Sequence, residues 1–219
     1  NFIRHILNKY DDYNIVNLDK LTYSGNLDNL KDIEKDKRYT FVKGDISLEK
    51  TIKSVFKKYQ PDYIINFAAE THVDRSIHVG ALEFIKTNIQ GVFNILEAVK
   101  SDKAVTKFLQ VSTDEVYGTL SLDSKEKFRE DTAFDPNVPY AATKAGGDLL
   151  CNAYHTTWKV PVVVTHCSNN YGPYQYPEKL IPFFTVRMLE GKKLPLYGDG
   201  KNVRDWIYVR DHCHALELA

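Results

Sequence analysis

Short apolar runs recur along the chain, and each has the length of a β-strand. The run at residues 63–69 is almost continuously apolar, which is typical of strands buried on both faces of a parallel sheet. The other predicted strands are residues 15–19, 40–45 (a strand and its turn), 107–112 and 161–165.

Between these runs, apolar positions repeat with the period of amphipathic helices. Helices are predicted at residues 2–10, 48–59, 81–100 and 140–158. In residues 81–100, the positions expected to face the core are Phe84, Ile85, Ile89, Val92, Phe93, Leu96 and Val99. Strands that alternate with helices predict an α/β fold with a doubly wound parallel sheet, whose ligands bind at the carboxyl ends of the strands.

The composition changes near residue 171, where Pro, Gly and Tyr become frequent. We therefore expect one domain over residues 1–170 and part of a smaller C-terminal domain over residues 171–219. The chain starts inside a predicted helix and ends within another helical pattern. We expect that it is incomplete, with a first strand missing before Asn1.

Composition and charge narrow the range of partners. The 219 residues are 43% hydrophobic and 26% charged, as in ordinary globular proteins. Lys plus Arg equals Asp plus Glu at 29 each, so no net charge favours nucleic acid or a membrane surface as partner. Three cysteines, an odd number in a long chain, indicate reduced thiols and a cytoplasmic location. No apolar run is long enough to span a bilayer.

Two groups of residues indicate a specific chemistry. Asp114 and Glu115 follow the strand at 107–112 through Thr113, and Tyr140 and Lys144 lie one helical turn apart on the next helix. A phenol with a pKa of about 10 needs a nearby cation to act as a base, and Lys144 can supply it. Adjacent carboxyl groups suit removal of a proton and a hydroxyl from neighbouring carbons. An exposed acid pair and a chance Tyr/Lys spacing are the ordinary alternatives, but the shared sheet edge favours dehydration with NAD as an internal redox agent.

Another acid, Asp19, ends the strand at 15–19. In a dinucleotide-binding fold, an acid at this place accepts hydrogen bonds from the adenosine ribose and disfavours a 2′-phosphate, so it predicts NAD rather than NADP. The alternative is a solvated loop acid or a helix cap. The turn at residues 44–46 resembles one that holds adenine, which favours the cofactor. No metal is predicted, because His72, His78, His166, His212 and His214 lack the spacing of metal ligands.

Seven segments carry a family resemblance that covers nearly the whole chain: residues 18–26, 67–76, 111–118, 139–145, 167–173, 177–182 and 203–208. The chain resembles the extended short-chain dehydrogenase/reductase superfamily and, within it, the dTDP-glucose 4,6-dehydratase family. This resemblance implies a Rossmann-like NAD-binding domain, a nucleotide-sugar-binding domain and a homodimer in which helices 81–100 and 140–158 pair with their copies. In two respects the chain departs from the family pattern. The glycine-rich loop is absent before Asn1, and His166 replaces a usual asparagine.

The resemblance also implies roles for individual residues. The implied catalytic residues are Thr113, Asp114, Glu115, Tyr140 and Lys144. The implied NAD contacts are Asp19, Lys20, Leu21, Thr22, Asp45, Ile46, Phe67, Ala68, Ala69, Thr71, Thr87, Tyr140, Lys144 and Asn170. The implied substrate contacts are Thr71, Thr113, Asn169, Lys179, Leu180, Pro195, Leu196, Tyr197 and Arg204. Lys179 and Arg204 suit a diphosphate, although a surface lysine and an ion pair with Asp205 are the simpler interpretations.

Three alternatives remain open at this point. A UDP-glucose 4,6-dehydratase shares the Thr-Asp-Glu run, although the segment at residues 204–206 favours dTDP. A nucleotide-sugar epimerase or decarboxylase shares the Tyr/Lys pair, although an epimerase needs no acid such as Asp114 at C6. A non-catalytic nucleotide-sugar-binding fragment is compatible with the missing glycine loop.

Overall fold

The computed structural model describes all residues from 1 to 219, and they form two compact units. The first, here called the sheet unit, contains Val16–Lys20, Phe41–Cys167 and Ala219. The second, here called the terminal unit, contains Asn1–Ile15, Leu21–Thr40 and Ser168–Leu218. The domain change near residue 171 stays a prediction.

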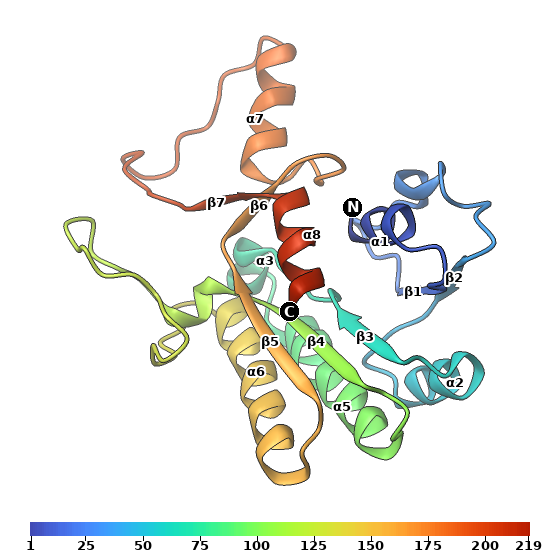
Figure 1. Ribbon diagram of the computed structural model, residues 1–219. Coiled ribbons are helices and arrows are strands. Elements are labelled where there is room, and N and C mark those ends of the chain that lie inside the picture. Colours follow the sequence, from blue (N-terminus) through green and yellow to red (C-terminus); the bar gives the residue numbers. More distant parts are fainter. The chain divides into compact units, whose positions relative to one another are not determined.

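The sheet unit is built on three parallel strands in the order β3 (Tyr63–Asn66), β4 (Lys107–Thr113) and β5 (Val162–Cys167). Figure 1 shows these strands side by side, with α5 (Val92–Ser101) and α6 (Pro139–Trp158) running along them. Two further strands, β1 (Ile15–Asp19) and β2 (Tyr39–Lys43), pair with each other. The predicted α/β fold with parallel strands and intervening helices is confirmed.

A buried apolar cluster joins the helices of the sheet unit to its strands. The remaining helical segments of this unit are α2 (Glu49–Tyr59), α3 (Val73–His78), α4 (Leu82–Phe84), η2 (Ile85–Gly91) and η3 (Asp114–Tyr117). The cluster consists of Ile46, Ile52, Val92, Ile95, Leu96, Val99, Val105, Phe108, Cys151, Tyr154 and Val160. Burial of this much apolar surface is the main force that fixes the sheet against its helices.

The helix predicted at residues 81–100 is present, but its middle segment, η2, is π-helical rather than α-helical. Two of its predicted core positions are wrong: Ile85 is 46% exposed and Phe93 is 39% exposed. Each follows directly on a core residue, Phe84 or Val92, which are 3% and 0% exposed. Because successive helical residues point about 100° apart, the neighbours of these core residues turn away from the core.

Strand β3 ends earlier than predicted, at Asn66 rather than at residue 69. The side chain of Asn66 explains the difference. Its Nδ2 donates to Gln110 Oε1 on β4 (2.8 Å), and its Oδ1 accepts from the Ala68 N–H (3.1 Å). The Ala68 N–H is therefore bonded to a side chain within its own segment and cannot donate to a neighbouring strand, so β3 ends here.

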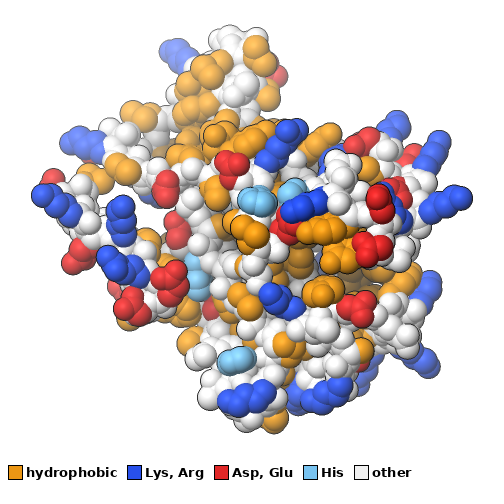
Figure 2. Space-filling model, in the orientation of Figure 1, with side chains coloured by type: hydrophobic (Ala, Val, Ile, Leu, Met, Phe, Trp, Pro, Cys, Tyr) orange, Lys and Arg blue, Asp and Glu red, His pale blue; other side chains and the backbone are white.

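The terminal unit is formed by segments from three parts of the chain. Its elements are α1 (Phe2–Lys9), η1 (Leu27–Leu30), β6 (Asn169–Tyr171), α7 (Leu180–Leu189), β7 (Trp206–Tyr208) and α8 (Val209–Leu218). β6 and β7 are parallel, with Asn169 opposite Trp206. Helix α7 is rich in apolar residues but buries none of them, and Figure 2 shows hydrophobic side chains on its surface at the top of the view. None of the helices is both long and apolar enough to cross a membrane.

Candidate active site at the end of strand β4

Strand β4 carries three predicted catalytic residues to its carboxyl end. Thr113 is 8% exposed and ends the strand, and η3 begins at Asp114. Thr113 Oγ1 accepts from the Glu115 N–H (3.3 Å) and donates to Asp114 Oδ1 (3.4 Å). Asp114 and Glu115 are consequently held half-buried in a capped turn and are not ordinary exposed turn acids.

Tyr140 lies in the first turn of α6 and is 7% exposed. Its N–H donates to Ser76 Oγ (3.3 Å), and its ring meets Phe84 edge-on at 6.4 Å between centroids. Burial raises the pKa of the Tyr140 phenol well above its usual range, and the charge of Glu115 raises it further, whereas a hydrogen bond with Thr113 acts in the opposite direction. These effects require that Tyr140, Thr113 and Glu115 lie close together. The structure therefore brings the predicted base and one predicted acid into one environment.

Lys144 follows one helical turn after Tyr140 and is 4% exposed. Its Nζ donates to the carbonyl oxygen of Val111 on β4 (2.8 Å). Burial lowers the pKa of Lys144, because a charged ammonium loses its hydration, and the charge of Asp148 acts against this effect.

Helix α6 also contributes Asp148 to a buried polar network that the sequence did not predict. The Asp148 side chain is 2% exposed, and its Oδ2 accepts from Ser112 Oγ (2.5 Å) and lies 3.2 Å from His166 Nε2. The other ring nitrogen of His166 lies 3.1 Å from the Tyr117 hydroxyl. His166, the residue that departs from the family pattern, thus joins β5 to α6 and η3. The one signal in the sequence was an acid four residues after Lys144, on the buried face of the helix.

Several predicted cofactor contacts gather at the end of β1. Asp19 is exposed, and its carbonyl oxygen accepts from the Gly44 N–H (3.0 Å). Lys20 Nζ pairs with Asp45 Oδ2 at 2.7 Å, and Asp45 Oδ1 accepts from the Ser47 N–H (2.8 Å). The sheet unit also carries the other predicted contacts Ile46, Phe67, Ala68, Ala69, Thr71 and Thr87.

The loop after β3 is fastened by Asn88 of η2. Asn88 Oδ1 accepts from the Glu70 N–H, and its Nδ2 donates to the Glu70 carbonyl oxygen, both at 3.0 Å. The same Nδ2 donates to Thr143 Oγ1 on α6 (3.0 Å). One buried amide therefore holds the loop that carries Thr71 and the helix that carries Tyr140.

The terminal unit contains the remaining predicted site residues: Leu21, Thr22, Asn169, Asn170, Lys179, Leu180, Pro195, Leu196, Tyr197 and Arg204. Leu196 and Tyr197 are each 72% exposed. Arg204 Nη1 donates to the Val203 carbonyl oxygen (2.7 Å), and Lys179 Nζ lies 3.8 Å from Glu178 Oε1. The roles of these residues stay predictions.

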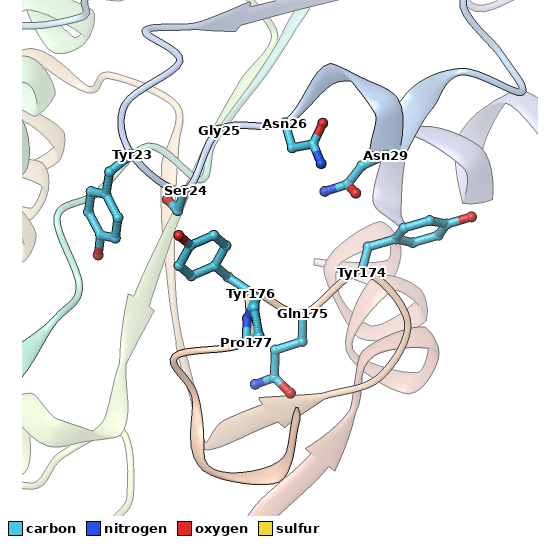
Figure 3. A pocket seen from close by; sticks show the side chains of 9 residues that line it. All are labelled: Tyr23, Ser24, Gly25, Asn26, Asn29, Tyr174, Gln175, Tyr176 and Pro177. Carbon is cyan, nitrogen blue, oxygen red and sulfur yellow. The ribbon is translucent and has the colours of Figure 1, made fainter. Parts of the chain in front are cut away.

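A separate hollow of about 430 Å³ lies within the terminal unit and contains none of the predicted site residues. Figure 3 shows it between the segment from Tyr23 to Asn29 and the segment from Tyr174 to Pro177. The rings of Tyr23 and Tyr176 meet edge-on, with 5.8 Å between centroids.

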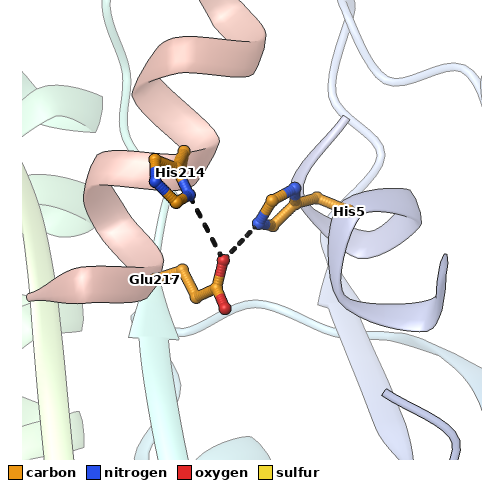
Figure 4. A group of neighbouring side chains, drawn as sticks. All are labelled: His5, His214 and Glu217. Atoms are coloured by element: carbon orange, nitrogen blue, oxygen red, sulfur yellow. Dashed lines mark hydrogen bonds and ion pairs between the residues drawn. The ribbon is translucent and has the colours of Figure 1, made fainter. Parts of the chain in front are cut away.

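A cluster in the terminal unit has the donor atoms of a metal site (Figure 4). Glu217 Oε2 lies 2.6 Å from His5 Nε2 and 3.6 Å from His214 Nδ1, while Oε1 accepts from Lys9 Nζ (2.5 Å) and from the Tyr10 hydroxyl. Lys9, followed by Tyr10 and His5, lowers the pKa of Glu217 to about 2. Because Lys9 already supplies the compensating positive charge, we interpret Glu217 as an ionic link between α1 and α8.

Fold and site together define a Rossmann-like α/β protein with a Tyr/Lys pair beside an acid pair. The family model described as GDP-mannose 4,6 dehydratase matches residues 1–219, and the chain belongs to this family. A curated relative, the dTDP-glucose 4,6-dehydratase of Xanthomonas campestris pv. campestris, is 50% identical over an alignment of 210 residues, and the match covers 92% of this chain and 59% of the relative. The chain thus spans less than two thirds of this relative, and the family resemblance predicted from the seven segments is confirmed.

Solved structures agree with this assignment. The crystal structure of dTDP-glucose 4,6-dehydratase from Bacillus anthracis in complex with NAD has 48% sequence identity and a TM-score of 0.90, and the match covers 99% of this chain and 66% of that one. UDP-glucuronic acid 4-epimerase from Bacillus cereus, in complex with UDP-glucuronic acid and NAD, has 29% identity and a TM-score of 0.88, and the match covers 97% and 66% of the two chains. The chain is therefore more similar in sequence to the dehydratase than to this epimerase.

Proposed function

We propose that the protein is a dTDP-glucose 4,6-dehydratase, which removes water from a nucleotide-activated hexose to give a 4-keto-6-deoxy sugar. One observation carries this proposal. Tyr140, the residue suited to oxidation at C4, has a hydrogen bond with Thr113 and is affected by the charge of Glu115, a residue suited to elimination. The two chemistries thus share one environment, and relatives named dTDP-glucose 4,6-dehydratase support the same function.

The sheet unit has features that fit NAD. Asp19 is an exposed acid at the end of β1, where a carboxylate can accept hydrogen bonds from ribose hydroxyls. Phe67 follows directly on β3 and leaves 48% of its surface exposed at the edge where parallel sheets bind ligands. We assign NAD binding to these residues together with the other predicted contacts. NAD held by these residues would supply a reversible hydride acceptor for C4 and C6, so that the reaction would cause no net oxidation.

Tyr140 removes the proton of the C4 hydroxyl in this proposal. Burial keeps its phenol protonated in the structure, so a positive charge must lie nearby when it acts as a base. Lys144 supplies that charge from the next turn of α6. Thr113 hydrogen-bonds the C4 oxygen, which positions it for proton transfer.

The acid pair then carries out the elimination. Oxidation at C4 acidifies the C5 proton, which Glu115 removes. Asp114 protonates the C6 hydroxyl, which leaves as water. Once the hydride has returned to C6, Glu115 gives its proton back to C5, which completes the 4-keto-6-deoxy sugar. These roles need one carboxylate and one carboxylic acid side by side, and the capped turn after Thr113 holds the two groups in fixed order.

Substrate binding is assigned to the terminal-unit residues, with Lys179 and Arg204 as partners of the diphosphate. We also propose a homodimer through α4, η2, α5 and α6. These helices expose Leu82 (63%), Ile85 (46%), Phe93 (39%) and Leu149 (58%), which a second copy can cover. Light scattering at micromolar concentration is expected to give a dimer, and a monomer would contradict this assignment.

Incubation with dTDP-glucose and catalytic NAD tests the function. We expect the base-labile chromophore of a 4-keto sugar to form without accumulation of NADH, and Tyr140→Phe to give none. Stoichiometric NADH without loss of water would replace the dehydratase with a simple dehydrogenase. A parallel assay with UDP-glucose compares kcat/KM for the two nucleotides and is expected to favour dTDP.

A further inference from the structure

Asp148 is a buried carboxylate to which the proposed reaction gives no role. Its side chain is 2% exposed, with Oδ2 held by Ser112 from β4 and His166 from β5. Tyr117 holds the opposite nitrogen of His166, and Oδ1 of Asp148 has no hydrogen-bond partner. A buried anion of this kind is costly unless a nearby positive charge compensates for it.

The nearby cation is Lys144, which lies four residues earlier on the same buried face of α6. Its Nζ has one hydrogen-bond acceptor on β4, the carbonyl oxygen of Val111 (2.8 Å). The groups with an electrostatic effect on Lys144 are Asp148, the Cys151 thiol on α6 and the Cys167 thiol on β5. Asp148 is the one carboxylate among them, so it is the main source of compensating negative charge.

We infer that Asp148 is a positioning residue: its carboxylate, anchored by Ser112 and His166, keeps Lys144 as an ammonium ion beside Tyr140. The inference rests on the proposed function in so far as Tyr140 and Lys144 act in the reaction. His166 contacts this carboxylate from β5, but the charge that acts on Lys144 is that of Asp148. The cationic lysine is thus maintained from the interior of the protein, on the side of the helix that faces the sheet.

Loss of the Asp148 charge should change the pKa of Lys144 in a known direction. Burial lowers the pKa of Lys144 and the charge of Asp148 raises it, so removal of that charge lowers it further. Lys144 would then lose its proton at lower pH, and the phenol of Tyr140 would lose its supporting cation. The alkaline limb of the pH–rate profile should therefore move to lower pH in Asp148→Asn, which keeps the shape of the side chain and removes its charge.

His166→Asn is the matched control, because it breaks the same contact with Asp148 but leaves the carboxylate charged. We expect the alkaline limb of Asp148→Asn to move down by about one pH unit or more, with about tenfold lower activity on that limb for each unit. In His166→Asn and Asp148→Glu, the alkaline limb of the pH–rate profile should lie at the same pH as in wild type. If Asp148→Asn folds and its limb coincides with that of wild type, the inference is wrong and Asp148 has only a packing role.

A second measurement does not depend on activity. In protein labelled with ¹³C at the lysine ε-carbon, the Lys144 resonance is identified by its loss in Lys144→Arg and is titrated with pH. It should titrate at lower pH in Asp148→Asn than in wild type or His166→Asn, and an unchanged titration would refute the inference. Asp148→Ser provides the same comparison if Asp148→Asn does not fold. A wild-type protein without dehydratase activity would overturn the proposed function, whereas the titration would still decide this inference.

Discussion

The two compact units differ in how they are held together. The sheet unit buries Val92, Leu96, Phe108 and Cys151 to 3% exposure or less, within one continuous apolar cluster. In the terminal unit the buried hydrophobic residues are Leu7, Cys213 and Leu216, at 3–4% exposure, and α7 buries none. Apolar burial therefore stabilises the first unit much more than the second.

Polar contacts hold the terminal unit instead. Arg38 Nη1 donates to the carbonyl oxygens of Leu7 (3.1 Å) and Tyr10 (2.6 Å), and the Arg4 guanidinium lies 4.4 Å from the ring centre of Tyr174. These partly buried contacts join the segments of the terminal unit, and each contributes only about 0.5–1.5 kcal/mol as a typical intramolecular hydrogen bond. The sheet unit, in contrast, buries charged groups such as Lys144 and Asp148 to 3–4% exposure, where each charge acts strongly on its neighbours. The residues of the proposed reaction at the end of β4 and on α6 therefore lie in the unit with the larger apolar core.

The largest expected effect is that of Tyr140→Phe, which removes one hydroxyl from the sheet unit. Because the role proposed for Tyr140 is at the first bond to change, hydride transfer and water loss should both fall by at least about 10²–10⁴-fold. Single-turnover absorbance of NADH and product analysis measure the two steps. Leu189→Gln on the exposed α7 is the control, and an equal loss of activity there would contradict the comparison.

Asp114→Asn and Glu115→Gln should separate the two steps. In the proposed reaction both residues act after the ketone exists, so each variant should still reduce bound NAD while losing water about 10²–10⁴-fold more slowly. Bound NADH should then accumulate in a single turnover. Water loss at the wild-type rate in Glu115→Gln would show that the role assigned to this residue is wrong.

Core substitutions test the difference in packing. Leu96 is fully buried, so Leu96→Ala should lower the free energy of unfolding by about 2–5 kcal/mol. Leu189 is 84% exposed, so Leu189→Ala should change it by no more than about 0.5 kcal/mol. Urea denaturation of the two variants measures both values. Similar losses would mean that α7 is covered by other protein surface in solution.

The smallest effect is expected for Glu217→Gln, which removes the ionic link between α1 and α8. The folded state lowers the pKa of Glu217 to about 2, so its contribution to stability is present above the usual glutamate range and is lost as the pH falls toward that value. The difference in Tm between wild type and Glu217→Gln should therefore shrink on acidification. A difference that stays constant with pH would argue against an ionic role.

The sequence predicted the elements whose patterns are local. The strand at 107–112, the helix at 140–158 and the placement of Tyr140 and Lys144 on one face all follow from periodicity and spacing, and the structure has them as β4 and α6. Tertiary contacts determine the features that it missed. Asn66, which ends β3 by accepting from the Ala68 N–H, is oriented by a hydrogen bond to Gln110, a residue 44 positions away. The link from Ser112 and His166 to Asp148 likewise joins separate elements, so no single segment could reveal it.

The π-helical segment η2 has a consequence for how this chain can change in length. A π-helical turn accommodates an extra residue, so Phe84 before η2 and Val92 after it both face the core. A deletion that restored an ordinary α-helical turn could leave both core positions in phase. The same deletion would move Asn88 away from Glu70 and Thr143, with which its amide forms hydrogen bonds. Evolution can therefore adjust the support of the site by gaining or losing one residue here, without rebuilding the core.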